Sequence, residues 1–215
     1  MRTVILLGML LAFPAVAEAQ VAPMTSAQRP DTAARAALQT FARLVSQRNF
    51  RAFGFETAED VRVATLGQPL REYMVWLEEL RSYTPSANAE SLLHAVDRVA
   101  YPVLVRGAVR SSLTLALERG RWTSYAFGNP TLTRSIEELR TELVARERLQ
   151  PAEIVLLRVP ALNTAFLAWS VNQRTVLTPL ADDARFGFQR GALMPAADAF
   201  GRMVAAARAH NGLPT

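Results

Sequence analysis

The sequence contains no cysteine and no lysine, and it has only two histidines. The absence of cysteine excludes disulfide bonds, thiol nucleophiles, thiolate metal sites and lipid attachment at a cysteine. Secreted animal domains usually carry disulfides, so the composition better fits an exported bacterial protein that is held together by packing alone. The one near-sequon agrees, because Asn129-Pro130-Thr131 has proline in the position that blocks glycosylation.

All 24 basic residues are arginine, and the formal net charge is +5. Without lysine, few groups titrate between neutrality and the very high pKa of arginine. The calculated pI of 10.6 therefore overstates how basic the chain is. The arginines are scattered along the sequence and form no basic arm, so we expect no nucleic-acid partner.

Residues suited to enzymatic chemistry are few and badly spaced. His94, Asp97 and Ser111-Ser112 can be assembled into a triad only on paper, because no Gly-x-Ser-x-Gly turn holds a nucleophilic serine. Ordinary surface polar residues are the better interpretation. No glycine-rich phosphate loop precedes a suitable helix.

Acidic residues also fail to indicate a metal site or an acid–base pair. Asp182-Asp183 lacks the alternating acids of a calcium loop, and histidine at zinc-ligand spacing is absent. Several glutamates are expected on the charged outer face of one helix, where neighbouring arginines provide ion pairs. We therefore expect no metal, no cofactor and no assigned catalytic residue. These glutamates are Glu137, Glu138, Glu142 and Glu147.

The first nineteen residues have the layout of a secretory signal peptide. Arg2 precedes an apolar run from Val4 to Phe13, and Ala17-Glu18-Ala19 places small residues where signal peptidase reads them. The run is short for a transmembrane span, although an uncleaved anchor is the alternative. We expect cleavage after Ala19, export to the periplasm or beyond, and no integral membrane segment afterwards.

The rest of the chain predicts a single α+β domain. Residues 20–30 should form a flexible mature N-terminus, and 31–91 a helical or mixed sub-block within a domain over 31–215. The sub-block begins with an amphipathic helix over 31–49 and has a capping-box sequence that starts a short helix over 57–65. Residues 70–83 fit both periodicities, and we favour a strand over 71–77 followed by a helical turn.

Two blocks of three strands and one helix follow, over 92–149 and 152–210. They are either a duplicated unit or parts of one antiparallel sheet with helices on one face. Alternation of apolar residues and tight-turn sequences place the elements. We expect strands over 101–105, 110–118, 121–127, 153–159, 164–171 and 174–180, and helices over 132–149 and 195–210.

Two sets of residues are candidates for binding. Aromatic residues of the predicted strands would form a concave apolar surface if they shared an uncovered sheet face, although core packing is the commoner role. Arginines beside the turns would cluster at one end of the first block and bind anions such as acidic lipids or glycans, unless they are simply solvated. The aromatic set is Trp76, Tyr101, Trp122, Tyr125 and Trp169, and the arginine set is Arg106, Arg110, Arg119 and Arg121.

Three functions remain open at this point. The first is a non-catalytic exported module that binds a small ligand or another envelope or secreted protein. The second is a hydrolase or isomerase that uses carboxylates and arginine, which requires a cleft holding an acid with a raised pKa. The third is an accessory, chaperone-like subunit for another exported protein.

Export provides the first prediction. Full-length protein produced in a Gram-negative host should appear in the periplasm with the mass of Gln20–Thr215, because signal peptidase cuts after Ala19. Intact-mass spectrometry of the periplasmic fraction measures this. Recovery of the uncut chain in the membrane fraction would contradict it.

Overall fold

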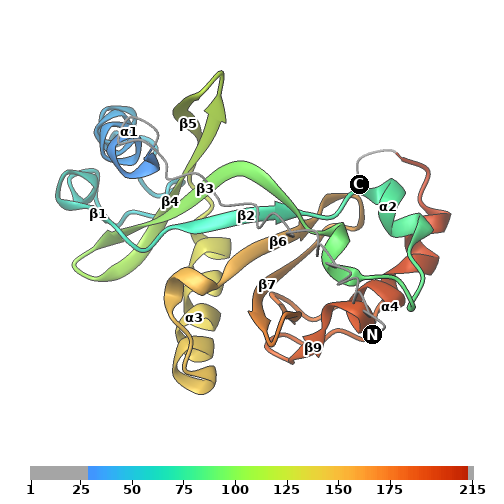
Figure 1. Cartoon of the computed structure of the whole chain (residues 1–215). Coiled ribbons are helices and arrows are strands. Elements are labelled where there is room, and N and C mark those ends of the chain that lie inside the picture. Colours follow the sequence, from blue (N-terminus) through green and yellow to red (C-terminus); the bar gives the residue numbers. More distant parts are fainter. Residues whose placement is uncertain (1–28, 213–215) are drawn as a thin grey trace, which may run out of the picture.

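The computed structural model describes residues 29–212, which form an α+β structure as the sequence predicts (Figure 1). The expected signal peptide and residues 20–28 of the expected flexible N-terminus lie outside this range. Among the described residues, no helix combines the length and the apolar character needed to cross a membrane. The helices are α1 (Pro30–Leu44), α2 (Leu77–Ser82), α3 (Pro130–Glu147) and α4 (Ala196–Ala209).

One nine-stranded sheet runs through both predicted blocks. Its order is β5-β4-β3-β2-β6-β7-β8-β9, with β1 paired to β3 beside this path. The strands are β1 (Thr65–Leu66), β2 (Leu70–Met74), β3 (His94–Val105), β4 (Ala108–Glu118), β5 (Arg121–Phe127), β6 (Val155–Val159), β7 (Thr164–Val171), β8 (Arg174–Pro179) and β9 (Met194–Pro195).

The two blocks meet at the pairing of β2 with β6. These strands are parallel, with Tyr73 opposite Leu157, whereas the other pairs in the sheet path are antiparallel. The sheet is therefore continuous but mixed, and the division into two three-stranded blocks is too simple. β2, which lies before both predicted blocks, is the strand that joins them.

Helices cover both faces of the sheet, which corrects the expectation of helices on one face. Successive residues of β6 show the division. Leu156 packs with Leu139 and Leu143 of α3, in what we call the α3 core, and Leu157 packs with Phe200 and Met203 of α4, in the α4 core. The α1 core is built on Val99, Tyr101 and Val103 of β3, on the same side as the α4 core. Figure 1 shows α1 and α3 on opposite sides of the sheet.

The first helix is shorter than predicted. The helix ends at Leu44 rather than near Asn49, because the Asn49 side chain accepts the backbone N–H of Ser46 and donates to the Leu44 carbonyl. Asparagine side chains compete in this way with the helical hydrogen bonds of the backbone.

The predicted helix over 57–65 is reduced to a 3₁₀ turn, Asp60–Val63. The Asp60 carboxylate accepts the backbone N–H groups of Glu56 and Thr57, the reach-back expected of a capping acid. The Thr57 hydrogen bond contributes most to a lowered pKa of Asp60. Further on, the strand-then-helix interpretation of 70–83 is correct, with β2 ending at Met74 and α2 beginning at Leu77.

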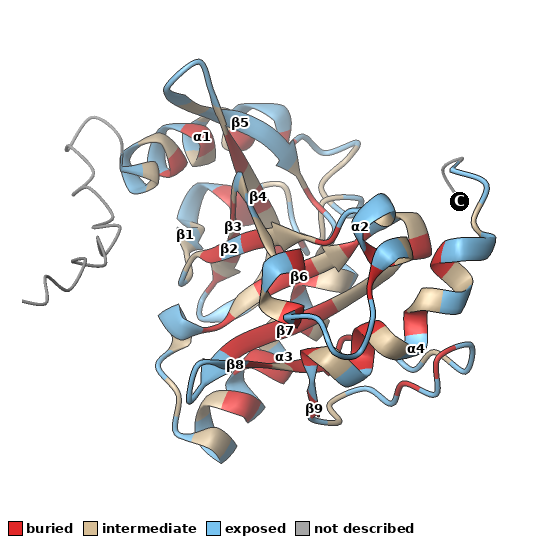
Figure 2. Cartoon of the chain, turned by 45° about the vertical axis from the view of Figure 1, so that its right-hand side comes forward, coloured by how far each residue is buried: buried red, intermediate tan, exposed pale blue. Residues whose placement is uncertain are grey.

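The core under α1 is aromatic. The Phe41 ring is fully buried and stacks on Phe127 at 4.7 Å between centroids. It also makes an edge-to-face contact with Phe53 and a tilted contact with Phe55. Figure 2 shows the buried colour on the inner side of α1 and the exposed colour along most of β5. Phe41 thus fixes α1 on an edge of the sheet that has few buried residues of its own.

Replacement of this ring tests the α1 core. Phe41→Ala should lower the free energy of unfolding by about 3–5 kcal/mol, because it leaves a cavity among the phenylalanines. Leu44→Ala in the same helix removes a side chain that is 50% exposed and should change stability by less than about 0.5 kcal/mol. Urea denaturation measures both, and equal effects would contradict this account of the core.

Candidate functional site

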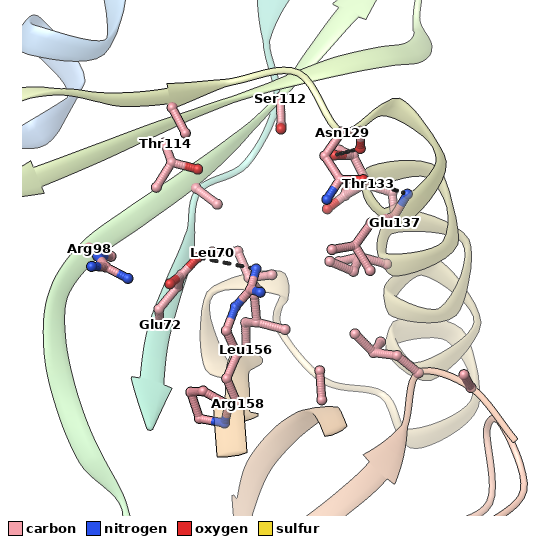
Figure 3. A pocket seen from close by; sticks show the side chains of 18 of the residues that line it. Leu70, Glu72, Arg98, Ser112, Thr114, Asn129, Thr133, Glu137, Leu156 and Arg158 are labelled. Carbon is pink, nitrogen blue, oxygen red and sulfur yellow. Dashed lines mark hydrogen bonds and ion pairs between the residues drawn. The ribbon is translucent and has the colours of Figure 1, made fainter. Parts of the chain in front are cut away.

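A groove of about 870 Å³ lies on the sheet face that carries α3. Its floor is formed by residues of the five strands β2, β3, β4, β5 and β6. The first half of α3 forms one wall, and residues 160–165 and 180–185 line one end. Figure 3 shows side chains of the sheet and of α3 facing each other across this space. The volume is typical of sites for small organic ligands.

The α3 wall is held by the start of its helix. Asn129 adopts a left-handed conformation, φ 61°, and its side chain accepts the backbone N–H of Leu132. Thr133 donates its hydroxyl to the Asn129 carbonyl at 2.8 Å. Pro130 suits the first turn because it has no N–H to satisfy. Capping thus fixes the helix end that borders the groove.

Three charged side chains lie on adjacent strands of the floor. Arg98 comes from β3, Glu72 from β2 and Arg158 from β6, and the order of these strands in the sheet is β3-β2-β6. A nitrogen of Arg158 lies 3.6 Å from a Glu72 oxygen (Figure 3). The Arg98 guanidinium lies over the Tyr125 ring, with Cζ 4.1 Å from the ring centroid.

Of these three charged side chains only Glu72 is buried, whereas Arg98 is half-buried and the Arg158 side chain is 36% exposed. The Glu72 side chain is only 5% exposed, and no hydrogen bond reaches its carboxylate from any residue in 29–212. In the same range, the buried Nε of Arg158 also has no hydrogen-bond partner. Buried charges are costly unless they are both paired and hydrogen-bonded. A row of charges with free hydrogen-bonding capacity is what a polar ligand requires.

Glu137 of α3 faces the groove from the other side. Its carboxylate contacts Arg140 at 2.8 Å, and Arg140 also donates to the carbonyls of Gln68 and Pro69. Burial raises the pKa of Glu137, and the neighbouring arginine partly opposes this shift. The buried Arg140 thereby ties the segment just before β2 to the helix that walls the groove.

Glu137 corrects one sequence-based expectation. Its side chain is 16% exposed and lines the groove, whereas all four glutamates of α3 were expected on the outer face. The other three are exposed or half-buried, and two of them have arginine partners: Glu147 pairs with Arg146 and Glu138 lies 3.8 Å from Arg190.

The five candidate aromatic residues are distributed among different environments. Tyr101 and Tyr125 line the groove, although the buried Tyr101 also belongs to the α1 core and donates its hydroxyl to Asp31. Trp169 is buried in the α3 core and Trp122 packs against the α1 core. Trp76 is 45% exposed, and its ring centroid lies 6.2 Å from that of His94.

The four turn-side arginines form two pairs rather than one cluster, which corrects the expected grouping. Arg106 and Arg110 lie at the start of β4, and Arg119 and Arg121 lie beyond its other end. An eleven-residue strand spans roughly 35 Å, so one ligand headgroup cannot contact both pairs. Arg106 and Arg119 occupy the left-handed first positions of two-residue turns completed by glycine, and Arg110 pairs with Glu56 at 2.6 Å.

The residues considered for a triad do not form one: His94 and Ser112 have other contacts, and the buried Ser111 hydroxyl has no hydrogen-bond partner within residues 29–212. His94 Nε2 lies 2.5 Å from Glu79, Asp97 is exposed, and Ser112 donates its hydroxyl to the Gly128 carbonyl. Asp183 is held by Arg185 at 2.7 Å. In residues 29–212, no group of three or more histidine and acidic side chains is arranged to hold a metal ion.

Sequence reasoning missed Glu72, Arg98 and Arg158 as a group. One signal was available, because Leu70, Glu72 and Met74 alternate on a strand and place a carboxylate between two apolar residues on one face. The two arginines gave no such signal among 24.

Comparison with known proteins adds no further assignment. No protein-family model, no curated protein and no solved structure matches this chain.

The raised pKa of Glu137 predicts a pH dependence. Because the folded state holds the proton more tightly than the unfolded state, this residue's contribution to stability should fall as the pH rises above its ordinary pKa of 4.5 through the higher folded value. Glu137→Gln cannot titrate and should lack this component. Denaturation of both proteins from about pH 4 to about pH 8 measures the difference, and a wild-type advantage that grows with pH would contradict the prediction.

Proposed function

We propose that this chain is an exported, non-catalytic module that binds a small ligand in the groove between the sheet and α3. The observation that carries the proposal is the row Arg98, Glu72 and Arg158, which lies on the groove floor with hydrogen-bonding capacity unused by residues 29–212. Apolar surface surrounds the row, as in most small-molecule sites. Export rests on the signal-peptide pattern of residues 1–19.

A small ligand fits this site better than a protein partner does. The groove is concave and is bordered on two sides, by α3 and by the loops that carry Asn163 and Asp182. A protein partner would more commonly use a wide surface with exposed aromatic anchors. Trp76 and Tyr125 are the large exposed aromatic side chains of the described residues, and only Tyr125 lines the groove.

A carboxylate-based hydrolase or isomerase is the second candidate. One observation favours it, because Glu137 lines the groove and has a raised pKa. Its Arg140 partner at 2.8 Å is a fixed cation that stabilises the ionised form, and Glu72 also has an arginine nearby. Glu137 is therefore held as an ion pair, and Glu72 lies beside an arginine with no hydrogen bond from the described residues, so binding is the better-supported function.

A groove-blocking substitution tests the proposal. Thr114 lies on β4 opposite Ala100 and lines the groove, so Thr114→Trp should fill it without entering the core. Wild-type protein purified gently from the periplasm should retain a small molecule in native mass spectra, and the variant should lose it. Thr84→Trp, at an exposed loop position, is the matched control and should retain it. The same retained mass in all three proteins, or none in any, would contradict the proposal.

A further inference from the structure

The polar groups of the groove floor have a defined charge order. Across the sheet they read cation, anion, cation, from Arg98 on β3 through Glu72 on β2 to Arg158 on β6. Neighbouring strands are roughly 4.8 Å apart. Arg158 is opposite Met74, two residues beyond the Leu156 that pairs with Glu72, and its side chain reaches back to within 3.6 Å of the Glu72 carboxylate. All three residues line the face that carries α3, because Glu72 is opposite Leu156 of the α3 core.

The hydrogen-bond donors and acceptors of this row that no described residue uses indicate what the polar end of a ligand must offer. Glu72 is a buried residue whose carboxylate receives no hydrogen bond within residues 29–212, so it can accept one from an N–H donor of a ligand. Arg98 stacks on Tyr125 but donates no hydrogen bond to any described residue, and the Arg158 Nε is equally unused. The arginines can therefore donate to an anionic acceptor beside that donor.

The other charged groups around the groove are already engaged. Glu137 contacts Arg140, Asp183 contacts Arg185, and Asp182 accepts the backbone N–H of Arg190 at 2.7 Å. They also lie on α3 and on the loop at one end rather than on the floor. The row on the sheet is thus the part of the groove with charged atoms available to a ligand.

Apolar side chains lie beside the row. Leu70 and Leu156 come from the same two central strands, and Ile136 and Leu132 face them from α3. This apolar strip suits a hydrocarbon body that extends away from the charged end.

We infer that the groove binds a zwitterionic amphiphile, with its ammonium on Glu72, its anionic group on Arg98 and Arg158, and its apolar body against the strip beside α3. The inference rests on the proposed function and names the ligand class for the same site. The anionic group can be a carboxylate, as in a long-chain amino acid, or a phosphate, as in an ethanolamine lysophospholipid.

Three matched probes test the headgroup. Calorimetric titration of the full mature protein with α-aminodecanoate, decanoate and decylamine compares the zwitterion with each charge alone. The zwitterion should bind about tenfold more tightly than either, because each single-charge probe makes the charge-assisted hydrogen bonds of only one end of the headgroup. Lysophosphatidylethanolamine with a decanoyl chain then separates the two sources, since tighter binding than α-aminodecanoate identifies phosphate as the acceptor.

Two substitutions should weaken binding of opposite charges: one that of the cationic probe and the other that of the anionic probe. Glu72→Gln should weaken α-aminodecanoate and decylamine about tenfold while decanoate binds as well or better, because the anion no longer meets a carboxylate. Arg98→Gln should weaken α-aminodecanoate and decanoate and leave decylamine unchanged. Arg71→Gln is the matched control, because Arg71 is exposed and pairs with Val99, which belongs to the core on the opposite face.

The outcomes separate this inference from the proposed function. Equal affinity for the three probes, or an unchanged preference in Glu72→Gln and Arg98→Gln, would overturn the headgroup assignment while groove binding stands. Binding of none of the probes would also overturn it, and the retained mass that Thr114→Trp removes would still establish a ligand of another class.

Discussion

The parallel pairing of β2 with β6 is the contact on which the rest of the structure depends. It joins two antiparallel sets of strands, and it does so in the middle of the sheet. Glu72 and Arg158 come from these two strands, and Arg98 comes from the next strand along. Parallel neighbours need a long connection, and here that connection includes β3, β4, β5 and α3. The same chain path therefore makes both the floor and the wall of the groove.

Arg140 is the second constraint, because it fixes the wall to the floor. Its guanidinium is buried, and it donates to the Gln68 and Pro69 carbonyls immediately before β2 begins. A buried arginine with a carboxylate and two carbonyls as acceptors has excellent geometry for its charge, which limits the desolvation cost. Glu137 provides the carboxylate from the same helix, so α3 and the start of β2 are held in one position.

Local sequence patterns predicted most elements of this fold but not their assembly. Two hairpins, β4–β5 and β7–β8, could be predicted from local sequence, because the turn and the alternation of apolar residues set the register of neighbouring strands. The signals were the alternation in 110–118 and the turn sequences Arg119-Gly120 and Asn172-Gln173. The β2–β6 pairing joins residues more than eighty positions apart, and no local pattern encodes it. The end of α1 was predicted wrongly for a different reason. The Asn49 side chain replaces a helical hydrogen bond at the Leu44 carbonyl, and the spacing of apolar residues carries no information about this contact.

The candidate site was hard to predict for the same reason that it is chemically informative. Arg98 and Arg158 are two of 24 arginines, and they become distinctive only when the sheet places them on either side of a buried carboxylate. Arg140 and Glu137 show how this fold satisfies a buried pair when the role is structural, with short contacts and carbonyl acceptors. Glu72 and Arg158 are 3.6 Å apart and lack such bonds among the described residues. Because the same chain builds a well-bonded pair at Glu137 and Arg140, the sparse bonding of the floor supports the proposal that a ligand completes it.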